Sequence, residues 1–277
     1  MNRYAVAGNP VEHSQSPFIH GLFAEATGEV VEYGRLLCPL NGFAETVRRF
    51  AAEGAAGCNV TVPFKFEAFA IAPQHTDRAA LAQAANVLRF DATGWLADNT
   101  DGVGLVTDIS HNAQWPLAGQ RVLLIGAGGA AAGALGALIE ARPAEITIAN
   151  RTLAKAEALV ARHQALAQHA SVTLRASALS NTSTAYDVVI NASASSLQGG
   201  PIPVAASVLR PGTLALDMMY GPAAQPFLNW ARAHGAVGRD GLGMLVEQAA
   251  ESFLLWRGVR PATTAVLAAL RQRVAPA

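Results

Sequence analysis

The sequence predicts an α/β protein with two domains: a mixed-sheet domain first, then a doubly wound domain, with a cleft between them. Short apolar runs alternate with helical patterns along almost the whole chain, which is typical of sheets covered by helices. A glycine-rich turn at 126–133 directly follows one of these runs. Upstream of this turn, polar residues at 98–102 mark the point where the first domain ends.

The individual elements follow from periodicity and turn residues. Strands are expected at 4–7, 31–36, 57–62, 86–90, 121–125, 145–149, 172–175, 186–191 and 213–217. Val87–Phe90 and Trp95–Ala97 flank an Asp-Ala-Thr-Gly turn, which predicts a hairpin and therefore a mixed first sheet. Helices are expected at 42–53, 102–111, 152–168, 242–256 and 262–273.

The domain boundaries follow from this order of elements. The first domain is expected to span 1–101, and the second is expected to span 102–240. A polar, proline-containing link at 112–119 precedes the fresh strand at 121. The last helices, within 241–277, are expected to pack back onto the first domain.

Composition excludes several classes of function. Of 277 residues, 51% are hydrophobic and 14% charged, and the net charge is zero, so nothing favours nucleic acid or anionic lipid. Residues 122–139 carry no charge, but five glycines interrupt them, which argues against a membrane helix. Cys38 and Cys58 are isolated, which predicts buried thiols in a reducing cytoplasm and no metal site. The N-terminus has no secretory pattern.

The turn after strand 121–125 predicts a Rossmann-type dinucleotide site. Gly126, Gly128 and Ala131 fit the pattern G-x-G-x-x-(G/A). The first glycine permits a tight turn and the second lets the backbone approach a pyrophosphate, which the following helix N-terminus attracts. The alternative is a glycine turn required only for strand–helix packing.

The end of the next strand favours NADP over NAD. Asn150 stands where an NAD-binding domain carries an acid, and Arg151 and Lys155 follow it. A guanidinium can hold a 2′-phosphate with paired, charge-assisted bonds. The alternatives are solvated surface charges and, for Thr152, a helix N-cap. Asn191, Ala192 and Ser193 end another buried strand and are expected to line the nicotinamide side.

Polar clusters in the first domain predict a second site. Ser14 and Ser16 precede Pro17, so either Ser16 caps a helix or both hydroxyls bind a carboxylate. A second group follows three successive strand ends and predicts a pocket that reads hydroxyls: Asn59, Thr61, Lys65, Asn86 and Asp101. Taken singly, these residues also suit strand-end hydrogen bonding, solvent exposure or, for Asp101, capping of helix 102–111.

Over nearly its full length the chain resembles shikimate dehydrogenases. The motifs that carry the resemblance are GNP (8–10), SQSP (14–17), NVTVPFK (59–65), DNTDGVG (98–104), GAGGA (126–130), NRT (150–152) and DGLGML (240–245). It implies reversible NADPH-dependent reduction of 3-dehydroshikimate to shikimate on the route to chorismate and the aromatic amino acids. The chain departs from the family pattern at Val87, at Ala131-Ala132 where an arginine often follows, and in the loop after Asn191. The absence of this arginine is expected to weaken the contacts to the cofactor phosphate.

The resemblance also implies a role for each site residue. Lys65 and Asp101 form the catalytic pair. Substrate contacts are Ser14 and Ser16 at the carboxylate, Tyr220 near it, and Asn59, Thr61, Lys65, Asn86, Asp101 and Gln248 at the ring hydroxyls. Cofactor contacts are Gly126, Ala127, Gly128, Gly129, Ala130, Asn150, Arg151, Thr152, Lys155, Asn191, Ala192, Ser193, Met218, Gly241 and Met244.

The chemistry agrees with Lys65 as the proton carrier. Hydride addition to a carbonyl produces an alkoxide, which needs charge stabilisation and a proton. The sequence contains neither Tyr-x-x-x-Lys nor a His/Cys zinc pattern. Two other functions remain open: an enzyme of the same family that also accepts quinate, and a non-catalytic NADP-binding sensor. The protein is expected to be a monomer or a homodimer.

Overall fold

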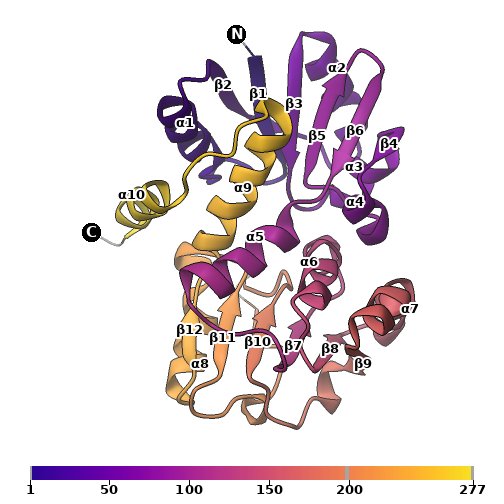
Figure 1. The fold of residues 1–277 in the computed structure, drawn as a ribbon, viewed down its shortest axis with the longest axis vertical. Coiled ribbons are helices and arrows are strands. Elements are labelled where there is room, and N and C mark those ends of the chain that lie inside the picture. Colours follow the sequence, from indigo (N-terminus) through magenta and orange to yellow (C-terminus); the bar gives the residue numbers. More distant parts are fainter. Residues whose placement is uncertain (1, 197–199, 276–277) are drawn as a thin grey trace. The chain divides into compact units, whose positions relative to one another are not determined.

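The chain forms two compact units. The computed structural model describes residues 2–196 and 200–275. Unit 1 comprises Met1–Gly104 and Leu245–Arg273, and unit 2 contains Leu105–Met244. Each unit is built on one sheet with helices packed against it (Figure 1). The ligand that each domain binds, and the cleft between the domains, stay predictions.

Unit 1 contains the predicted mixed sheet. Its six strands lie in the order β2-β1-β3-β5-β6-β4. The strands are β1 (Asn2–Gly8), β2 (Val31–Leu37), β3 (Ala55–Val60), β4 (Gln74–His75), β5 (Val87–Asp91) and β6 (Gly94–Asp98). The first three are mutually parallel, whereas β5 runs antiparallel to both β3 and β6, so the predicted hairpin is confirmed. The strand β4, which is only two residues long, was not predicted.

Helices pack against both faces of this sheet. They are α1 (Ser16–Thr27), α2 (Phe43–Ala52), α3 (Lys65–Ile71), α4 (Asp77–Ala82), α9 (Leu242–Arg257) and α10 (Thr264–Val274). On one face, Phe43 of α2 stacks on Phe64 at 4.7 Å, beside the buried thiols Cys38 and Cys58. On the other, Tyr4 of β1 stacks on Trp256 of α9 at 4.5 Å. Because strand side chains alternate, Asn59 shares the face of Tyr4.

Unit 2 is a doubly wound parallel sheet, as predicted. Its strands lie in the order β12-β11-β10-β7-β8-β9, all parallel. They are β7 (Arg121–Ile125), β8 (Glu145–Asn150), β9 (Thr173–Ala178), β10 (Val188–Asn191), β11 (Leu214–Asp217) and β12 (Val237–Arg239). The chain reverses its winding direction between β7 and β10, so a ligand crevice is expected at the carboxyl ends of these two strands. The three-residue β12 was not predicted.

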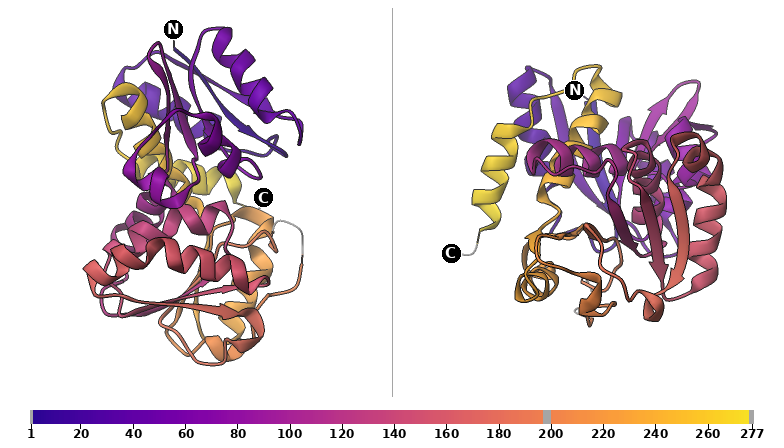
Figure 2. Two further views of the ribbon diagram at one scale, coloured as in Figure 1. Left: turned by 90° about the vertical axis from the view of Figure 1, so that its right-hand side faces the viewer. Right: turned by 60° about the horizontal axis from the view of Figure 1, so that its bottom comes forward.

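Three longer helices complete unit 2: α6 (Gly129–Glu140), α7 (Leu153–Ala170) and α8 (Gln225–Ala233). The helices α6 and α7 cover one face of the sheet and α8 the other (Figure 2). Residues 122–139 form β7, the glycine turn and most of α6. None of the helices in the described part of the chain is both long and apolar enough to cross a membrane.

The predicted helix at 102–111 is two elements. The α-helix α5 (Asp101–Thr107) widens into a π-helical turn at Asp108–Asn112. This turn places the fully buried carboxylate of Asp108 against Arg239, whose Nε and Nη2 donate to its two oxygens at 2.8 and 2.5 Å. The predicted helix is therefore confirmed, but the sequence pattern revealed neither the π-helical form of its second half nor the buried ion pair.

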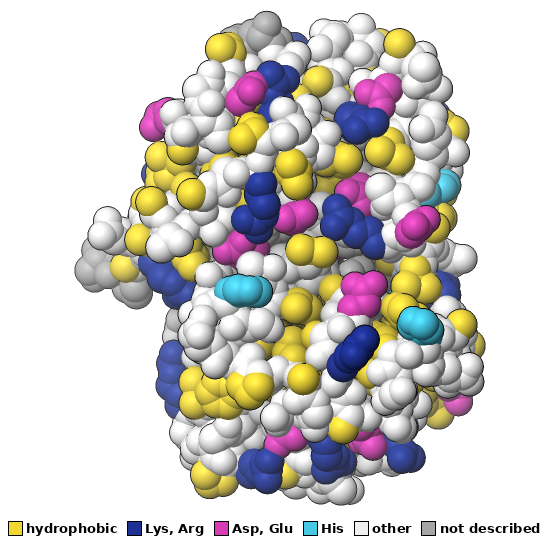
Figure 3. All heavy atoms as spheres, viewed as in Figure 1, with side chains coloured by type: hydrophobic (Ala, Val, Ile, Leu, Met, Phe, Trp, Pro, Cys, Tyr) yellow, Lys and Arg dark blue, Asp and Glu magenta, His cyan; other side chains and the backbone are white. Residues whose placement is uncertain are grey.

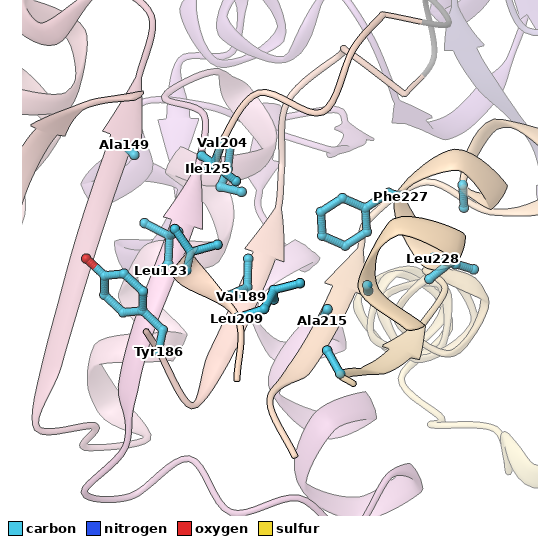
Figure 4. Close-up of a cluster of buried hydrophobic side chains, with 14 residues drawn as sticks. Leu123, Ile125, Ala149, Tyr186, Val189, Val204, Leu209, Ala215, Phe227 and Leu228 are labelled. Atoms are coloured by element: carbon cyan, nitrogen blue, oxygen red, sulfur yellow. The ribbon is translucent and has the colours of Figure 1, made fainter. Parts of the chain in front are cut away.

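A hydrophobic core fixes the strand ends of unit 2. Leu123, Val189 and Ala215 come from neighbouring strands and lie in one cluster with Phe227 and Leu228 of α8 (Figure 4). Close packing of this kind resists displacement of the strands. The carboxyl ends of β7, β10 and β11 are therefore held in a defined row.

Candidate active site

The segment NVTVPFK ends a strand and begins a helix. The strand β3 ends at Val60, two residues earlier than predicted, because the chain turns at Thr61. The N–H of Thr61 still donates to the carbonyl of Ala7 at 2.9 Å, but its own carbonyl accepts the N–H of Phe64 at 3.1 Å. Lys65 is then the first residue of α3.

Lys65 and Asp101 meet directly. Lys65 Nζ lies 2.5 Å from Asp101 Oδ2, and only 15% and 5% of the two side chains are exposed. Asp101 does not cap α5, contrary to the alternative considered above. Asn99 Oδ1 accepts the N–H of Asp101 at 3.1 Å, so the carboxylate of Asp101 is left for Lys65 and its neighbours.

Asn86 is the centre of a buried network around this pair. The two hydrogens of its Nδ2 are shared among three acceptors: Asp101 Oδ1 at 3.0 Å, Gln248 Oε1 at 3.0 Å and Thr100 Oγ1 at 2.9 Å. Its Oδ1 accepts the N–H of Thr100 at 2.8 Å. A Cβ at Gly104 would lie 2.7 Å from the backbone nitrogen of Gln248, so only glycine permits this close approach of α5 and α9. The structure thus joins four predicted residues, Lys65, Asn86, Asp101 and Gln248.

Asn59 belongs to a second, adjacent network. It accepts a 2.6 Å bond from Tyr33 Oη and donates to Ser252 Oγ at 2.9 Å. His20 stacks on Tyr33 at 4.2 Å, and burial lowers the pKa of this histidine to about 3, so it is neutral. Tyr33 and Ser252 were not predicted as site residues. The only available signal for Ser252 was its position one helical turn after Gln248.

The two serines are adjacent, but Ser16 is not the N-cap of α1. Ser14 Oγ lies 3.2 Å from Ser16 Oγ and accepts the N–H of Ser16 at 3.3 Å. The carbonyl of Gln15 accepts the N–H of Ile19, so Gln15 is the N-cap and Ser16 is the first helical residue. Arg35 Nη2 donates to the carbonyl of Ser14 at 2.7 Å and fixes this turn from β2.

The glycine turn of unit 2 fits a dinucleotide. Gly126 has φ +109°, and a Cβ on it would lie 3.1 Å from Ala192. A Cβ at Gly128 would meet no atom within 4 Å, and α6 begins there without a side-chain cap. Backbone N–H groups and open space at a helix N-terminus are what a pyrophosphate requires. Ala127, Gly129 and Ala130 lie half-buried in the same turn.

The end of β8 fits a 2′-phosphate. Arg151 and Lys155 are exposed, and in the described ranges neither forms an ion pair with a carboxylate. Asn150 Nδ2 donates to the carbonyl of Thr152 at 2.9 Å and orders the turn between them. Thr152 occupies the N-cap position of α7, but its hydroxyl makes no capping bond.

Most of the remaining predicted cofactor contacts, and the predicted substrate contact Tyr220, lie at or shortly after the ends of β10 and β11. Asn191 and Asp217 are register partners, and the N–H of Met218 donates to the carbonyl of Asn191 at 3.0 Å. Ala192, Ser193 and Tyr220 are half-buried nearby in the chain, whereas Met244 is only 7% exposed. Gly241 donates to the carbonyl of Met219 at 2.9 Å. Among the residues with a described position, no three His, Cys, Asp or Glu side chains gather as a metal site would require.

Fold and site define the class as a dinucleotide-dependent α/β oxidoreductase. On the face drawn in Figure 3, basic side chains lie among acidic ones rather than in a single patch. Three family descriptions match the chain: a shikimate dehydrogenase substrate binding domain at 6–88, a shikimate / quinate 5-dehydrogenase at 108–198, and a shikimate 5′-dehydrogenase C-terminal domain at 241–271. The chain therefore belongs to the shikimate dehydrogenase family.

Individual relatives agree with this assignment. Shikimate dehydrogenase (NADP(+)) of Methylibium petroleiphilum is 66% identical over 98% of this chain and 94% of its own length. The protein of that name from an Acidovorax species is 59% identical over 98% and 96%. A shikimate 5-dehydrogenase from Thermus thermophilus, solved with NADP(H) and shikimate, has 28% identity, a TM-score of 0.84 and 98% and 99% coverage. An Ael1 enzyme from Pseudomonas putida has 45% identity, a TM-score of 0.88 and 100% and 99% coverage. The predicted family, oxidoreductase class and NADP cofactor are confirmed.

Proposed function

We propose that the chain catalyses the reversible NADPH-dependent reduction of 3-dehydroshikimate to shikimate, a step toward chorismate and the aromatic amino acids. The observation that carries this proposal is the 2.5 Å Lys65–Asp101 pair held within the Asn86–Gln248 network. An ammonium beside amide and hydroxyl groups can both bind a ring hydroxyl and protonate its oxygen. The proposed substrate and cofactor are those that appear in the names of the similar proteins.

Lys65 carries the acid–base chemistry in this proposal. NADPH, when bound, supplies the hydride. The ammonium of Lys65 then neutralises the developing alkoxide and donates a proton from Nζ to that oxygen, and in the reverse direction its amine accepts the proton. Asp101 holds Nζ in place through Oδ2, while Asn86 fixes Oδ1 of the same carboxylate.

The other predicted residues bind and orient the substrate. Ser14 and Ser16 present two hydroxyls at the start of α1, which suits the substrate carboxylate, and Tyr220 assists there. Asn59, Thr61, Asn86 and Gln248 read the ring hydroxyls. If NADP binds as proposed, residues 126–130 would hold its pyrophosphate, and Arg151 with Asn150, Thr152 and Lys155 would hold its 2′-phosphate. Asn191–Ser193, Met218, Gly241 and Met244 would hold its nicotinamide half.

We also propose that the enzyme acts in the cytoplasm as a monomer or a homodimer. The free thiols of Cys38 and Cys58 suit a reducing compartment. Light scattering on the purified protein, which reports the mass of one chain or two, distinguishes the two assemblies.

One assay tests the reaction. Purified protein is given NADP⁺ or NAD⁺ with shikimate or quinate, and the absorbance of the reduced nicotinamide is followed. Shikimate with NADP⁺ is expected to be the best pair. Comparable turnover of quinate would identify the broader enzyme. Failure to oxidise shikimate with either cofactor would contradict the proposal, and NADP⁺ binding without any turnover would identify a sensor.

A further inference from the structure

Asp217 is a buried carboxylate that the reaction described above does not use. It ends β11 and is 0% exposed. Each of its described hydrogen-bond partners is neutral: Asn191 Nδ2 at 3.1 Å, Ser196 Oγ at 2.5 Å and the N–H of Met219 at 2.9 Å. A buried charge without a cationic partner is costly, and burial raises the pKa of this carboxyl. Its presence therefore requires an explanation beyond packing.

The bonds of Asp217 fix the orientation of the Asn191 amide. Because Nδ2 points to the carboxylate, Oδ1 points the other way and accepts both the N–H of Ser193 at 3.2 Å and its hydroxyl at 2.7 Å. Ser193 Oγ in turn lies 2.7 Å from Ser195 Oγ. The carboxylate thus orders residues 191–196 through one chain of hydrogen bonds.

This loop is coupled to the glycine turn. Ile125, Asn191 and Asp217 form one row across β7, β10 and β11, at the place where the sheet reverses its winding. The N–H of Ala192 donates to the carbonyl of Ile125 at 2.8 Å, and Ala192 is the residue that a Cβ at Gly126 would meet at 3.1 Å. A shift of residues 191–196 would therefore disturb the turn on which a pyrophosphate is expected.

We propose that Asp217 is a positioning residue for NADP: it holds Asn191 and the serines that follow in the arrangement that accepts the cofactor. It contacts neither hydride nor substrate in this role and acts through Asn191 and Ser196. This inference rests on the proposed function only in assigning the nicotinamide half to residues 191–193.

The test is the isosteric variant Asp217→Asn. Its side-chain amide places an NH2 group where the carboxylate of Asp217 accepts hydrogen bonds. Its dissociation constant for NADP⁺, measured by titration calorimetry without substrate, is expected to rise about 10- to 100-fold, as for loss of hydrogen bonds to a charged group. The KM for NADP⁺ should rise in parallel while the KM for shikimate stays within about twofold. Unchanged NADP⁺ affinity would overturn the proposal.

Asp187→Asn is the matched control. Asp187 lies at the opposite end of the same sheet, where Oδ2 accepts the N–H of Arg121 at 2.8 Å and Oδ1 pairs with Arg210. Asp187→Asn should lower the free energy of unfolding without raising the dissociation constant for NADP⁺. An equal rise of that constant in both variants would mean that Asp217→Asn acts through general destabilisation, and would overturn the proposal. If Asp217→Asn does not fold, Ser196→Ala decides: a rise of about 3- to 10-fold in the dissociation constant is expected, and no rise contradicts the proposal.

The same binding data separate this inference from the proposed reaction. If the wild-type protein binds NADP⁺ but does not oxidise shikimate, the proposed reaction fails while the role of Asp217 is still measured. If it oxidises shikimate and Asp217→Asn binds NADP⁺ normally, only the role of Asp217 fails.

Discussion

Asp98 and Asp217 occupy equivalent places in the two units but have opposite surroundings. Each is a buried carboxylate at the end of a strand, β6 or β11, and each accepts a backbone N–H from the turn that follows. Arg78 donates two hydrogen bonds to the carboxylate of Asp98, at 2.7 and 2.6 Å, and the hydroxyl of Thr76 donates a third at 2.6 Å. Within residues 2–196 and 200–275, the donors to Asp217 are all neutral.

The pKa values of the two groups follow this difference. Burial acts to raise the pKa of Asp98, but the hydrogen bonds and charge of Arg78 outweigh burial and hold it below its ordinary value. At Asp217, burial prevails over its neutral donors and the pKa is raised. The charge-compensated carboxylate can therefore serve as scaffold for the Asn99–Asp101 turn, whereas the uncompensated one lies where a ligand is expected.

Replacing Lys65 would turn Asp101 into a second uncompensated carboxylate and should give the largest effect. In Lys65→Met, the proton donor is lost and kcat is expected to fall about 10²- to 10⁴-fold, with a smaller change in the KM for shikimate. Steady-state kinetics measure both. Arg89→Met, which removes a cation paired with Asp91 on the hairpin, is the control and should leave kcat unchanged. A normal kcat in Lys65→Met would remove this lysine from the chemistry.

Arg151 is the cationic counterpart of Asp217, since it has no carboxylate partner in the described chain. Arg151→Ala should raise the KM for NADP⁺ about 10- to 100-fold and leave that for NAD⁺ within about twofold, because only NADP⁺ carries the 2′-phosphate. Arg175→Ala is the control, because Arg175 pairs with Glu145. Equal losses with both cofactors would refute the 2′-phosphate contact.

Asp98→Asn tests the scaffold role. The variant loses the charge-assisted bonds of Arg78, and the free energy of unfolding measured in urea is expected to fall by about 1–3 kcal/mol. Arg78 is 38% exposed and can rehydrate, so the larger loss typical of a fully buried pair is not expected. Asp91→Asn breaks the half-buried pair with Arg89, which among the described residues has no further donor comparable to Thr76, and should cost at most about 1 kcal/mol. If both variants lose equally, the compensated carboxylate has no special structural role.

Local pattern predicted much of this molecule, and the remainder depends on topology. The Gly126 turn, the strand ends and the Lys65–Asp101 meeting follow from residue types at strand termini, because carboxyl ends of parallel strands share one edge. Asn59 and Ser252, by contrast, are 193 residues apart, and no periodicity pairs them. Asp217 gave no signal either, because an acid after an apolar strand is also what a solvent-exposed turn would carry. The strands β4 and β12 are too short to show alternation.

The finest test compares how the two carboxylates respond to pH. For Asp98, whose pKa is lowered on folding, the unfolded chain binds more protons, so its contribution is present above its ordinary pKa of 3.8 and is lost as pH falls through the lower folded value. For Asp217, whose pKa is raised, the folded chain binds more protons, so stability declines as pH rises from 3.8 through the higher folded value. Unfolding free energies of wild type, Asp98→Asn and Asp217→Asn between about pH 3 and 7 report both. The stability difference from wild type should shrink toward acid for Asp98→Asn and grow toward acid for Asp217→Asn. Slopes of the same sign would mean that Asp217 is compensated after all.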